Sequence, residues 1–324
     1  MRREDPQNSL HIWDGFLLFA SHEIVNTFHA HYAASVVVAV NSTEEWKIRG
    51  ARSSRRPDEA DERTGAIRIE DEQSARDTYT AVLIPPNYPH RLSAPGTDVL
   101  VLQIDPDLDE FQPLAARVAG SGTPRALQIS DVESREVAIT GMDADGAGAD
   151  GETEIAGVHN LAERVARLMR ESVGCAEALH LCRDILKAAS GTSPPRSARR
   201  LDERVDTVLK HLRGLDELPV DINTEEMARL VGLSEERFRV IFKRHMGLRF
   251  RRYLLWLRLR RAAVLLGDGA NLTEAAHASG FYDSAHFSRT FREMLGHAPS
   301  DILGQPRRLR IQSCWPDAAA RNSP

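Results

Sequence analysis

The groups with the clearest chemistry lie near the C-terminus, where basic and small side chains recur at helical spacing. Phe238 and Phe242 are four residues apart, as are Phe287 and Phe291, so each pair shares one face of a helix. Burying that face turns the opposite one outward, with Glu236, Arg239, Val240 and Lys243 in the first helix and Ala285, Ser288, Arg289 and Arg292 in the second. Arginine bonds guanine bidentately, lysine and arginine neutralise phosphates, and small apolar groups meet a thymine methyl. The pattern therefore predicts two helices that read a DNA major groove.

A second set of chemically capable residues lies in the first third of the chain, where three histidines fall beside predicted strands. His29 and His31 point to one face of a strand because side chains alternate, and His90 follows another strand. Together they could form a three-imidazole metal site, or they could contact an effector or pack in the core. Trp46 and Tyr88 are further candidates for an effector pocket, with core packing as the alternative.

The two predicted DNA-reading helices belong to a repeated pattern. The segments 226–232 and 274–280 both read Glu-x-Ala-x3-Gly, and each is followed by its phenylalanine pair. Each copy predicts a short helix, a glycine turn and a second helix, which is a helix-turn-helix. A helix predicted over residues 250–266 separates the copies and spans roughly 25 Å at about 1.5 Å per residue. Two recognition helices so spaced could reach successive major-groove faces about 34 Å apart, with some bending of the DNA.

The remaining elements must hold these side chains in place. Residues 10–105 contain short segments rich in β-branched and aromatic residues between turn signals, which predicts a small β-barrel or sandwich. Helical periodicity over 155–189 predicts a pair of helices that either forms a dimerisation hairpin or covers the barrel. The sequence thus predicts a multidomain α and β protein with an effector-sensing domain at 1–152, a helical segment at 153–190, a linker at 191–200, a DNA-binding domain at 201–304 and a tail at 305–324.

Composition limits the class of protein. The chain has 324 residues, enough for two domains with separate cores, and a net charge of −5. Residues 201–312 hold 19 Lys and Arg against 15 Asp and Glu, so this part carries +4 and the rest −9, which suits DNA as a partner of the C-terminal part only. No apolar run approaches the roughly 18 residues that cross a bilayer, so no membrane partner is predicted. The odd number of cysteines favours a reducing cytoplasm, with Cys175 and Cys182 predicted as small buried residues.

Residues from about 205 to 303 resemble the DNA-binding domain of the AraC-type transcription regulators. The matching motifs are Met227-Ala228 to Gly232, Leu233-Ser234, Phe242-Lys243-Arg244, Gly247, Tyr253-Leu254, Arg258-Leu259 to Ala262, Ala276, Gly280-Phe281, the run from His286 to Arg292, Gly296 and Pro299. In that family the outward positions of both recognition helices touch bases or phosphates, and the resemblance adds Ser284 and His286 to the candidates. The chain departs from the family after Pro299, where Ile302-Leu303 replaces an aromatic-arginine pair. The carboxylate of Glu236 repels phosphate, so it either accepts from a cytosine amino group or avoids contact.

The N-terminal half resembles, more weakly, the cupin-like sensor barrels attached to AraC-type regulators. The resemblance implies a small-molecule effector between the sheet walls, a homodimer, and a contact with RNA polymerase as transcription activators make. Metal-dependent cupins place a carboxylate a few residues after the paired histidines, and residues 32–36 offer none, so no metal is assigned. The sequence therefore predicts a cytoplasmic transcription regulator in which an effector shifts the arrangement of the sensor and DNA-binding domains.

Two other interpretations stay open on the sequence alone. One is a cupin-type metalloprotein or metalloenzyme that holds a metal at the three histidines and uses the helical region as an interaction module. The other is a constitutive DNA binder whose barrel serves only to dimerise. The sequence has no Gly-rich phosphate loop, no Gly-x-Ser-x-Gly motif and no Cys-x2-Cys pair, so no other enzyme activity and no cofactor is predicted.

Overall fold

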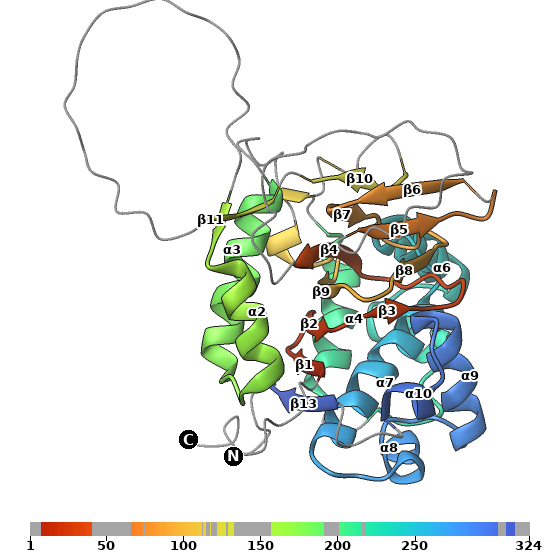
Figure 1. The fold of residues 1–324 in the computed structure, drawn as a ribbon. Coiled ribbons are helices and arrows are strands. Elements are labelled where there is room, and N and C mark those ends of the chain that lie inside the picture. The colour runs from red at the N-terminus through yellow and green to blue at the C-terminus, as the bar shows by residue number, and fades with distance from the viewer. Residues whose placement is uncertain are drawn as a thin grey trace, which may run out of the picture.

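An N-terminal domain of β-sheets and a C-terminal domain of helices pack side by side in the computed structural model (Figure 1). The structure describes residues 8–40, 66–73, 75–111, 113–114, 117, 122–127, 129–132, 157–190, 201–215, 218–303 and 309–314. The predicted fold class, a β-rich domain followed by a helical one, is confirmed. Trp46 and the predicted linker at 191–200 lie outside the described residues. Within the described ranges, no helix is long and apolar enough to cross a membrane.

Two facing sheets form the N-terminal domain. Their strands are β1 (Asn8–Ile12), β2 (Phe16–Ser21), β3 (Ile24–Val25), β4 (Ala34–Val40), β5 (Ile67–Glu70), β6 (Arg76–Tyr79), β7 (Ala81–Ile84), β8 (Arg91–Ala94), β9 (Asp98–Ile104), β10 (Arg125–Ala126) and β13 (Leu309–Ser313). The larger sheet has the order β10-β7-β4-β9-β2-β1-β13, and the smaller has the order β3-β8-β5-β6. A separate parallel pair joins β11 (Ser130–Val132) to β12 (Gly157–His159).

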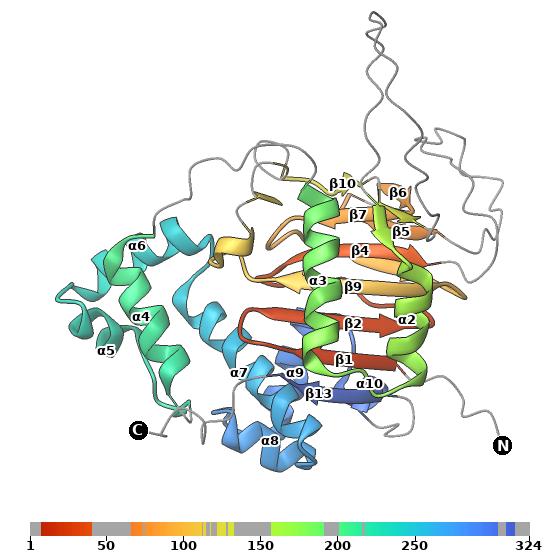
Figure 2. The ribbon, with the colours of Figure 1, turned by 90° about the vertical axis from the view of Figure 1, so that its left-hand side faces the viewer.

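Strand β4 shows why both faces of the larger sheet are buried. Val37 packs in the core between the two sheets, whereas Val36 and Val38 pack with the helices α2 (Leu161–Arg170) and α3 (Cys175–Ser190) on the other face. A strand covered on both faces takes an unbroken apolar sequence. Figure 2 shows α2 and α3 lying across this sheet. The predicted helical pair therefore covers the β domain, which was one of its two predicted roles.

The C-terminal domain contains the predicted double helix-turn-helix. Its helices are α4 (Glu203–Gly214), α5 (Thr224–Leu230), α6 (Glu235–Met246), α7 (Phe250–Gly267), α8 (Leu272–Ala278), α9 (Ser284–Leu295) and α10 (Pro299–Leu303). The phenylalanine pairs of α6 and α9 are buried, as predicted, and each ring contributes about 1.5–3 kcal/mol by leaving water. Gly280 has a φ of 81°, and a Cβ there would lie 2.1 Å from the main-chain oxygen of Leu218, so this turn requires glycine.

Helix α7 lies between the two domains, so it is buried on nearly all sides. Tyr253 and Leu257 pack into the helical core, while Trp256 and Arg260 face the β domain. The Arg260 guanidinium donates to Asp105 Oδ2 at 2.6 Å, and Trp256 Nε1 donates to Asp105 Oδ1 at 3.0 Å. Arg260 also donates to the main-chain oxygens of residues 13 and 16. Burial raises the pKa of the Asp105 carboxyl group, and the positive charge of Arg260 opposes this rise.

Further buried polar contacts extend this interface. Arg213 of α4 forms an ion pair with Asp107 at 2.5 Å, and Tyr32 donates to the same carboxylate at 3.0 Å. Arg252 of α7 donates to the carbonyl oxygen of Ala30 at 2.7 Å. The two domains are therefore held together by charged groups of one domain that bind carboxylates and carbonyls of the other.

The C-terminal tail carries a strand that the sequence did not predict. Strand β13 pairs in parallel with β1, with Asn8 opposite Leu309, and is followed by a disulfide between Cys314 and Cys175 at the start of α3. The prediction that the cysteines are reduced is therefore wrong for Cys175 and Cys314. These two residues are 139 positions apart in the sequence, and the fold brings them together. Cys182 is buried as predicted, and burial raises the pKa of its thiol to about 12.

Substitution of Asp105 by Asn is expected to lower the free energy of unfolding by about 3–5 kcal/mol, because it leaves the buried Arg260 charge without a counter-charge. Urea denaturation of the two proteins measures the difference. Glu225→Gln is the matched control, because its ion pair with Arg229 is exposed and contributes no more than about 1 kcal/mol. Equal midpoints for Asp105→Asn and Glu225→Gln would contradict the assigned role of the buried pair.

The disulfide predicts a simple thiol count. Alkylation of the air-purified, unfolded chain is expected to modify one cysteine, Cys182, and all three after reduction, as counted by mass spectrometry. Cys314→Ser should release the thiol of Cys175 and raise the count without reductant to two. Modification of three cysteines in the unreduced wild-type chain would show that the pair does not form.

Candidate nucleic-acid interface and interdomain cavity

Helix α6 presents the first of the two predicted recognition faces. Ser234 caps its N-terminus by accepting a hydrogen bond from the amide of Arg237. The outward candidates are all exposed, namely Glu236, Arg239, Val240 and Lys243. Val240 is 63% exposed, and an apolar side chain so placed beside basic groups suits contact with a thymine methyl.

Arg239 carries the main positive charge at the centre of this face. It forms an ion pair with Glu235 one turn earlier, and its side chain is still 63% exposed. Exposed pairs of this kind contribute little to stability, so the guanidinium can leave Glu235 for a phosphate or a base at small cost. Glu236 follows Glu235 in the first turn of α6, and its carboxylate makes the N-terminal end of the face acidic.

Helix α9 presents the second face, with Asp283 as its N-cap. Ala285, Arg289 and Arg292 are exposed there, and Ser284, His286 and Ser288 are half-buried. In the part of the chain that the structure describes, Arg289 and Arg292 form no ion pair, so both guanidinium groups are available to a phosphate or a guanine.

Two of the half-buried groups already have partners inside the domain. The hydroxyl of Ser288 donates to the carbonyl oxygen of Ser284 at 2.8 Å, which leaves its lone pairs to accept from a base amino group. The ring of His286 meets the buried ring of Phe281 edge-on at 5.3 Å between centroids. His286 therefore helps to fix the start of α9, and only part of its ring reaches the surface.

Tyr282 is a candidate that the sequence analysis missed. Its side chain is 77% exposed although its neighbour Phe281 is fully buried. It precedes the cap of α9, so it lies where a recognition helix approaches the DNA backbone. The available signal was an aromatic residue just outside the helical repeat.

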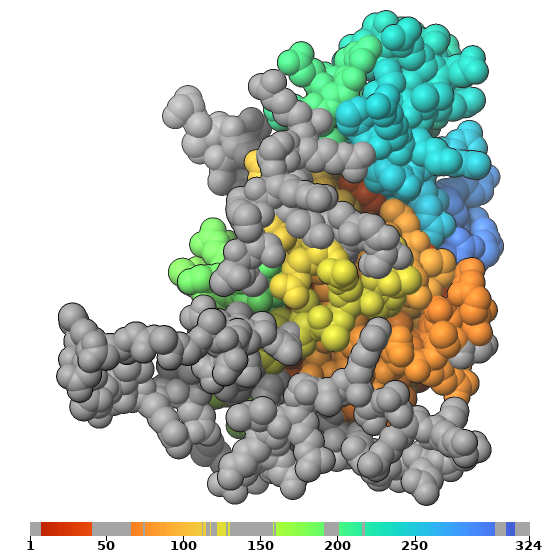
Figure 3. Space-filling view, turned by 90° about the horizontal axis from the view of Figure 1, so that it is seen from above, coloured from red at the N-terminus to blue at the C-terminus, as the bar shows by residue number. Residues whose placement is uncertain are grey.

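Figure 3 shows the helices α4 to α6, in green to cyan, as a lobe beside the orange strands of the β domain.

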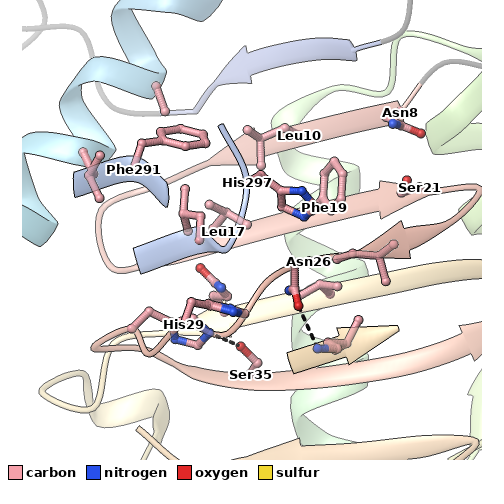
Figure 4. Close-up of a pocket in the computed structure, with 18 of the residues that line it drawn as sticks. Asn8, Leu10, Leu17, Phe19, Ser21, Asn26, His29, Ser35, Phe291 and His297 are labelled. Carbon is pink, nitrogen blue, oxygen red and sulfur yellow. Dashed lines mark hydrogen bonds between the residues drawn. The ribbon is translucent and has the colours of Figure 1, made fainter. Parts of the chain in front are cut away.

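A cavity of about 360 Å³ lies between the two domains. One wall comes from the β domain, with Leu17, Phe19 and Val37, and the other from the buried faces of α7 and α9, with Leu259 and Phe291. Figure 4 shows Phe291 and His297 on one side, across from Leu17 and Phe19 on their strand. The lining is mainly apolar, and its polar groups include Asn26, Ser35, Gln103 and the three histidines considered in the sequence analysis.

The structure brings the three histidines together at this cavity. His29, His31 and His90 are all buried, and each ring places a nitrogen within 4.8 Å of the other two. Burial, and then the nearness of His90, lowers the pKa of His29 to about 3. Burial likewise lowers the pKa of His31 well below its ordinary value and lowers that of His90. All three rings are therefore neutral at pH 7.

The other effector-pocket candidates are placed differently. Tyr88 stacks on His90 at 6.3 Å between ring centroids and packs against the core between the sheets, but it is not part of the cavity wall. Trp46 lies outside the described residues. The sequence does not predict the wall supplied by α7 and α9, because the apolar side chains of these helices are typical of core residues.

The end of the second recognition helix is bonded directly to the β domain. Gly296 caps the C-terminus of α9, and its carbonyl oxygen accepts from both the amide and the hydroxyl of Thr27 at 2.9 Å. Nδ1 of His29 lies 2.9 Å from the carbonyl oxygen of Thr27. A change in the conformation of the segment from Thr27 to His29 would therefore be transmitted to the C-terminal end of α9 through the two hydrogen bonds between Thr27 and Gly296.

Comparison with known proteins identifies the C-terminal part. Residues 227–305 match the family described as "Helix-turn-helix domain". The uncharacterized HTH-type transcriptional regulator YpdC of Escherichia coli K12 is 27% identical over 124 residues, which cover 38% of this chain and 41% of YpdC. The HTH-type transcriptional activator RhaS of Escherichia fergusonii is 36% identical over 104 residues, which cover 31% of this chain and 37% of RhaS. The chain thus matches well under half the length of these relatives.

Among solved structures, ToxT from Vibrio cholerae O395 aligns with 90% of this chain and 98% of its own, at 11% identity and a TM-score of 0.47. The family match covers both helix-turn-helix units with their recognition helices from α5 onward. The relatives that share this region are HTH-type transcription regulators. The C-terminal domain of this chain is therefore similar to the AraC-type helix-turn-helix domain of known transcription regulators.

Proposed function

We propose that the whole chain is a transcription regulator whose DNA affinity is set by a small molecule in the interdomain cavity. The observation that carries the proposal is the composition of the cavity wall, which the β domain and the buried faces of α7 and α9 supply together. A ligand in this space touches the sensor strands and the inner side of a recognition helix at once. Its binding energy therefore depends on how the two domains are arranged.

The DNA contacts come from the outward side chains of α6 and α9. Arg289 and Arg292 suit guanine or phosphate, and Arg239 and Lys243 suit the same partners on α6. Tyr282 adds an exposed aromatic group at the start of α9. The two faces differ in charge and shape, since α6 carries Glu236 and Val240 where α9 carries Ala285 and Arg289, so each helix reads its own half of the site.

The proposed effector is a small, mostly apolar molecule with one polar end. The cavity volume lies within the range of about 300–1,000 Å³ that is typical of ligand pockets, and apolar side chains dominate its wall. The polar end would meet the cluster of Asn26, Ser35 and Gln103. Effector binding would change DNA affinity by about 5- to 150-fold, the usual range of coupling between two sites.

The localisation and the protein partners are proposed from the resemblance to AraC-type regulators. The chain would act in the cytoplasm, without enzymatic activity, with RNA polymerase and a second copy of itself as protein partners. The outer surface of α2 and α3 is charged, with ion pairs such as Arg164 to Asp184, so a dimer formed there would be a polar one.

The DNA for the test is a duplex that the purified chain selects from a random-sequence library. Arg289→Ala and Arg239→Ala are each expected to weaken binding to this duplex about 5- to 150-fold, since a bidentate base contact contributes about 1–3 kcal/mol. Fluorescence anisotropy at two salt concentrations measures the change, and a melting curve shows that folding is intact. Arg167→Ala is the matched control, because it is also an exposed, ion-paired arginine, but on α2. Selection of no preferred sequence, or unchanged affinity in both variants, would overturn the proposal.

Filling the cavity tests the effector site. Leu17→Trp places an indole in the space between the domains and should reduce the affinity of any small molecule bound there by about tenfold or more. A thermal-shift screen of small apolar acids and alcohols on the wild-type chain supplies the ligands, since a ligand at 100 times its Kd adds about 2.7 kcal/mol to stability. Leu230→Trp, at an exposed position of α5, is the control. Equal stabilisation of both variants would place the ligand elsewhere.

A further inference from the structure

The three buried histidines are held in one place by the backbone of two neighbouring segments. His29 and His90 face each other in an antiparallel bridge, in which each amide donates to the other's carbonyl at 3.0 and 2.9 Å. Residues paired in this way carry their side chains on the same face, and His31 is two positions beyond His29 and shares that face. The ring centroids lie 4.4 Å apart for His29 and His90, 5.5 Å for His29 and His31, and 5.6 Å for His31 and His90.

A second feature fixes how each ring can bind. Nδ1 of His29 contacts the carbonyl oxygen of Thr27 at 2.9 Å, Nδ1 of His31 that of Ala33 at 2.8 Å, and Nδ1 of His90 that of Tyr88 at 2.8 Å. A carbonyl oxygen only accepts, so all three Nδ1 atoms carry the proton. The Nε2 atoms are then the nitrogens with a lone pair. Histidines that bind a metal through Nε2 are held by this same Nδ1–H to carbonyl bond, which sets the tautomer and the ring orientation.

The kind of ligand follows from the donor set. Three converging imidazoles without a carboxylate suit a borderline transition metal such as Zn²⁺ or Co²⁺, whereas Mg²⁺ and Ca²⁺ require oxygen donors. Three protein ligands also leave a fourth position for water or another molecule. The amide oxygen of Gln103 is buried in the same cavity wall, and it has no hydrogen-bond partner in the part of the chain that the structure describes. It could accept a hydrogen bond from a metal-bound water.

We propose that His29, His31 and His90 bind one divalent transition metal ion of the zinc class through their Nε2 atoms, with a fourth coordination position open to the interdomain cavity. The ion would join the segment from Thr27 to His31 with His90, which directly precedes β8, an inner strand of the smaller sheet. Because Thr27 binds the carbonyl of Gly296 at the end of α9, the metal would also fix the contact between the β domain and the second recognition helix. Metal binding does not depend on the proposed DNA-binding function, and it is measured without DNA.

The test uses the full chain after treatment with a chelator. Titration with Co²⁺ is expected to produce the visible absorption bands of a four-coordinate site that saturate at one ion per chain, and Zn²⁺ should abolish them by displacement. His90→Gln and His31→Gln should each weaken binding by more than about 100-fold, because loss of even an outer-sphere partner costs about 10- to 100-fold. His11→Gln is the matched control, since His11 is also buried but binds the carbonyl of Val173 through Nε2.

A measurement on the wild-type chain guards against misfolded variants. X-ray absorption of the zinc-loaded protein should show about three imidazole nitrogens at roughly 2.0–2.1 Å and no sulfur ligand. The Arg289→Ala chain should bind metal as the wild type does even where it no longer binds DNA, which separates this proposal from the preceding one. Less than a tenth of an equivalent of bound Co²⁺, a sulfur-containing shell, or unchanged affinity in a folded His90→Gln variant would overturn the proposal.

Discussion

The buried pair of Asp105 and Arg260 is the contact on which the arrangement of this molecule depends. Asp105 directly follows β9, the middle strand of the larger sheet, and Arg260 lies on α7, the helix that separates the two helix-turn-helix units. Both side chains are almost fully removed from water. Two charges placed there are costly unless they meet, so the domains must dock in the one orientation that pairs them. Trp256, one turn earlier on α7, donates a hydrogen bond to the same carboxylate and so restricts the docking orientation further. The cavity extends to this contact, since Trp256 and Arg260 line it together with the three histidines.

Docking through α7 also gives the recognition helices unequal positions. Helix α9 is bonded to the β domain at its C-terminal cap and contributes Phe291 to the cavity wall, whereas no residue of α6 lines that wall. A molecule or metal ion in the cavity would therefore act first on α9.

The disulfide and β13 tie the end of the chain back to its beginning. Strand β13 extends the larger sheet beside β1, and the Cys175–Cys314 bond fastens it to α3. The returning strand also packs against α7, so it adds a second link between the β domain and the helical domain. Gly267 at the end of α7 comes close to Ile311, where a Cβ would lie 2.7 Å from a side-chain methyl, so the tail also packs tightly against this helix.

The double helix-turn-helix and its exposed faces were predictable from the sequence, because those features follow from local spacing. Phe238 and Phe242 occupy one side of a helix whatever surrounds it, and Arg239 must then face the other way. The residues that face the cavity could not be predicted in this way, since Trp256, Leu259 and Phe291 look like ordinary core residues until a second domain packs against them. Nor could the pairing of Cys175 with Cys314 and the convergence of His90 with His29, because each joins positions far apart in the chain. Such contacts depend on strand pairing and domain docking, which local spacing does not encode.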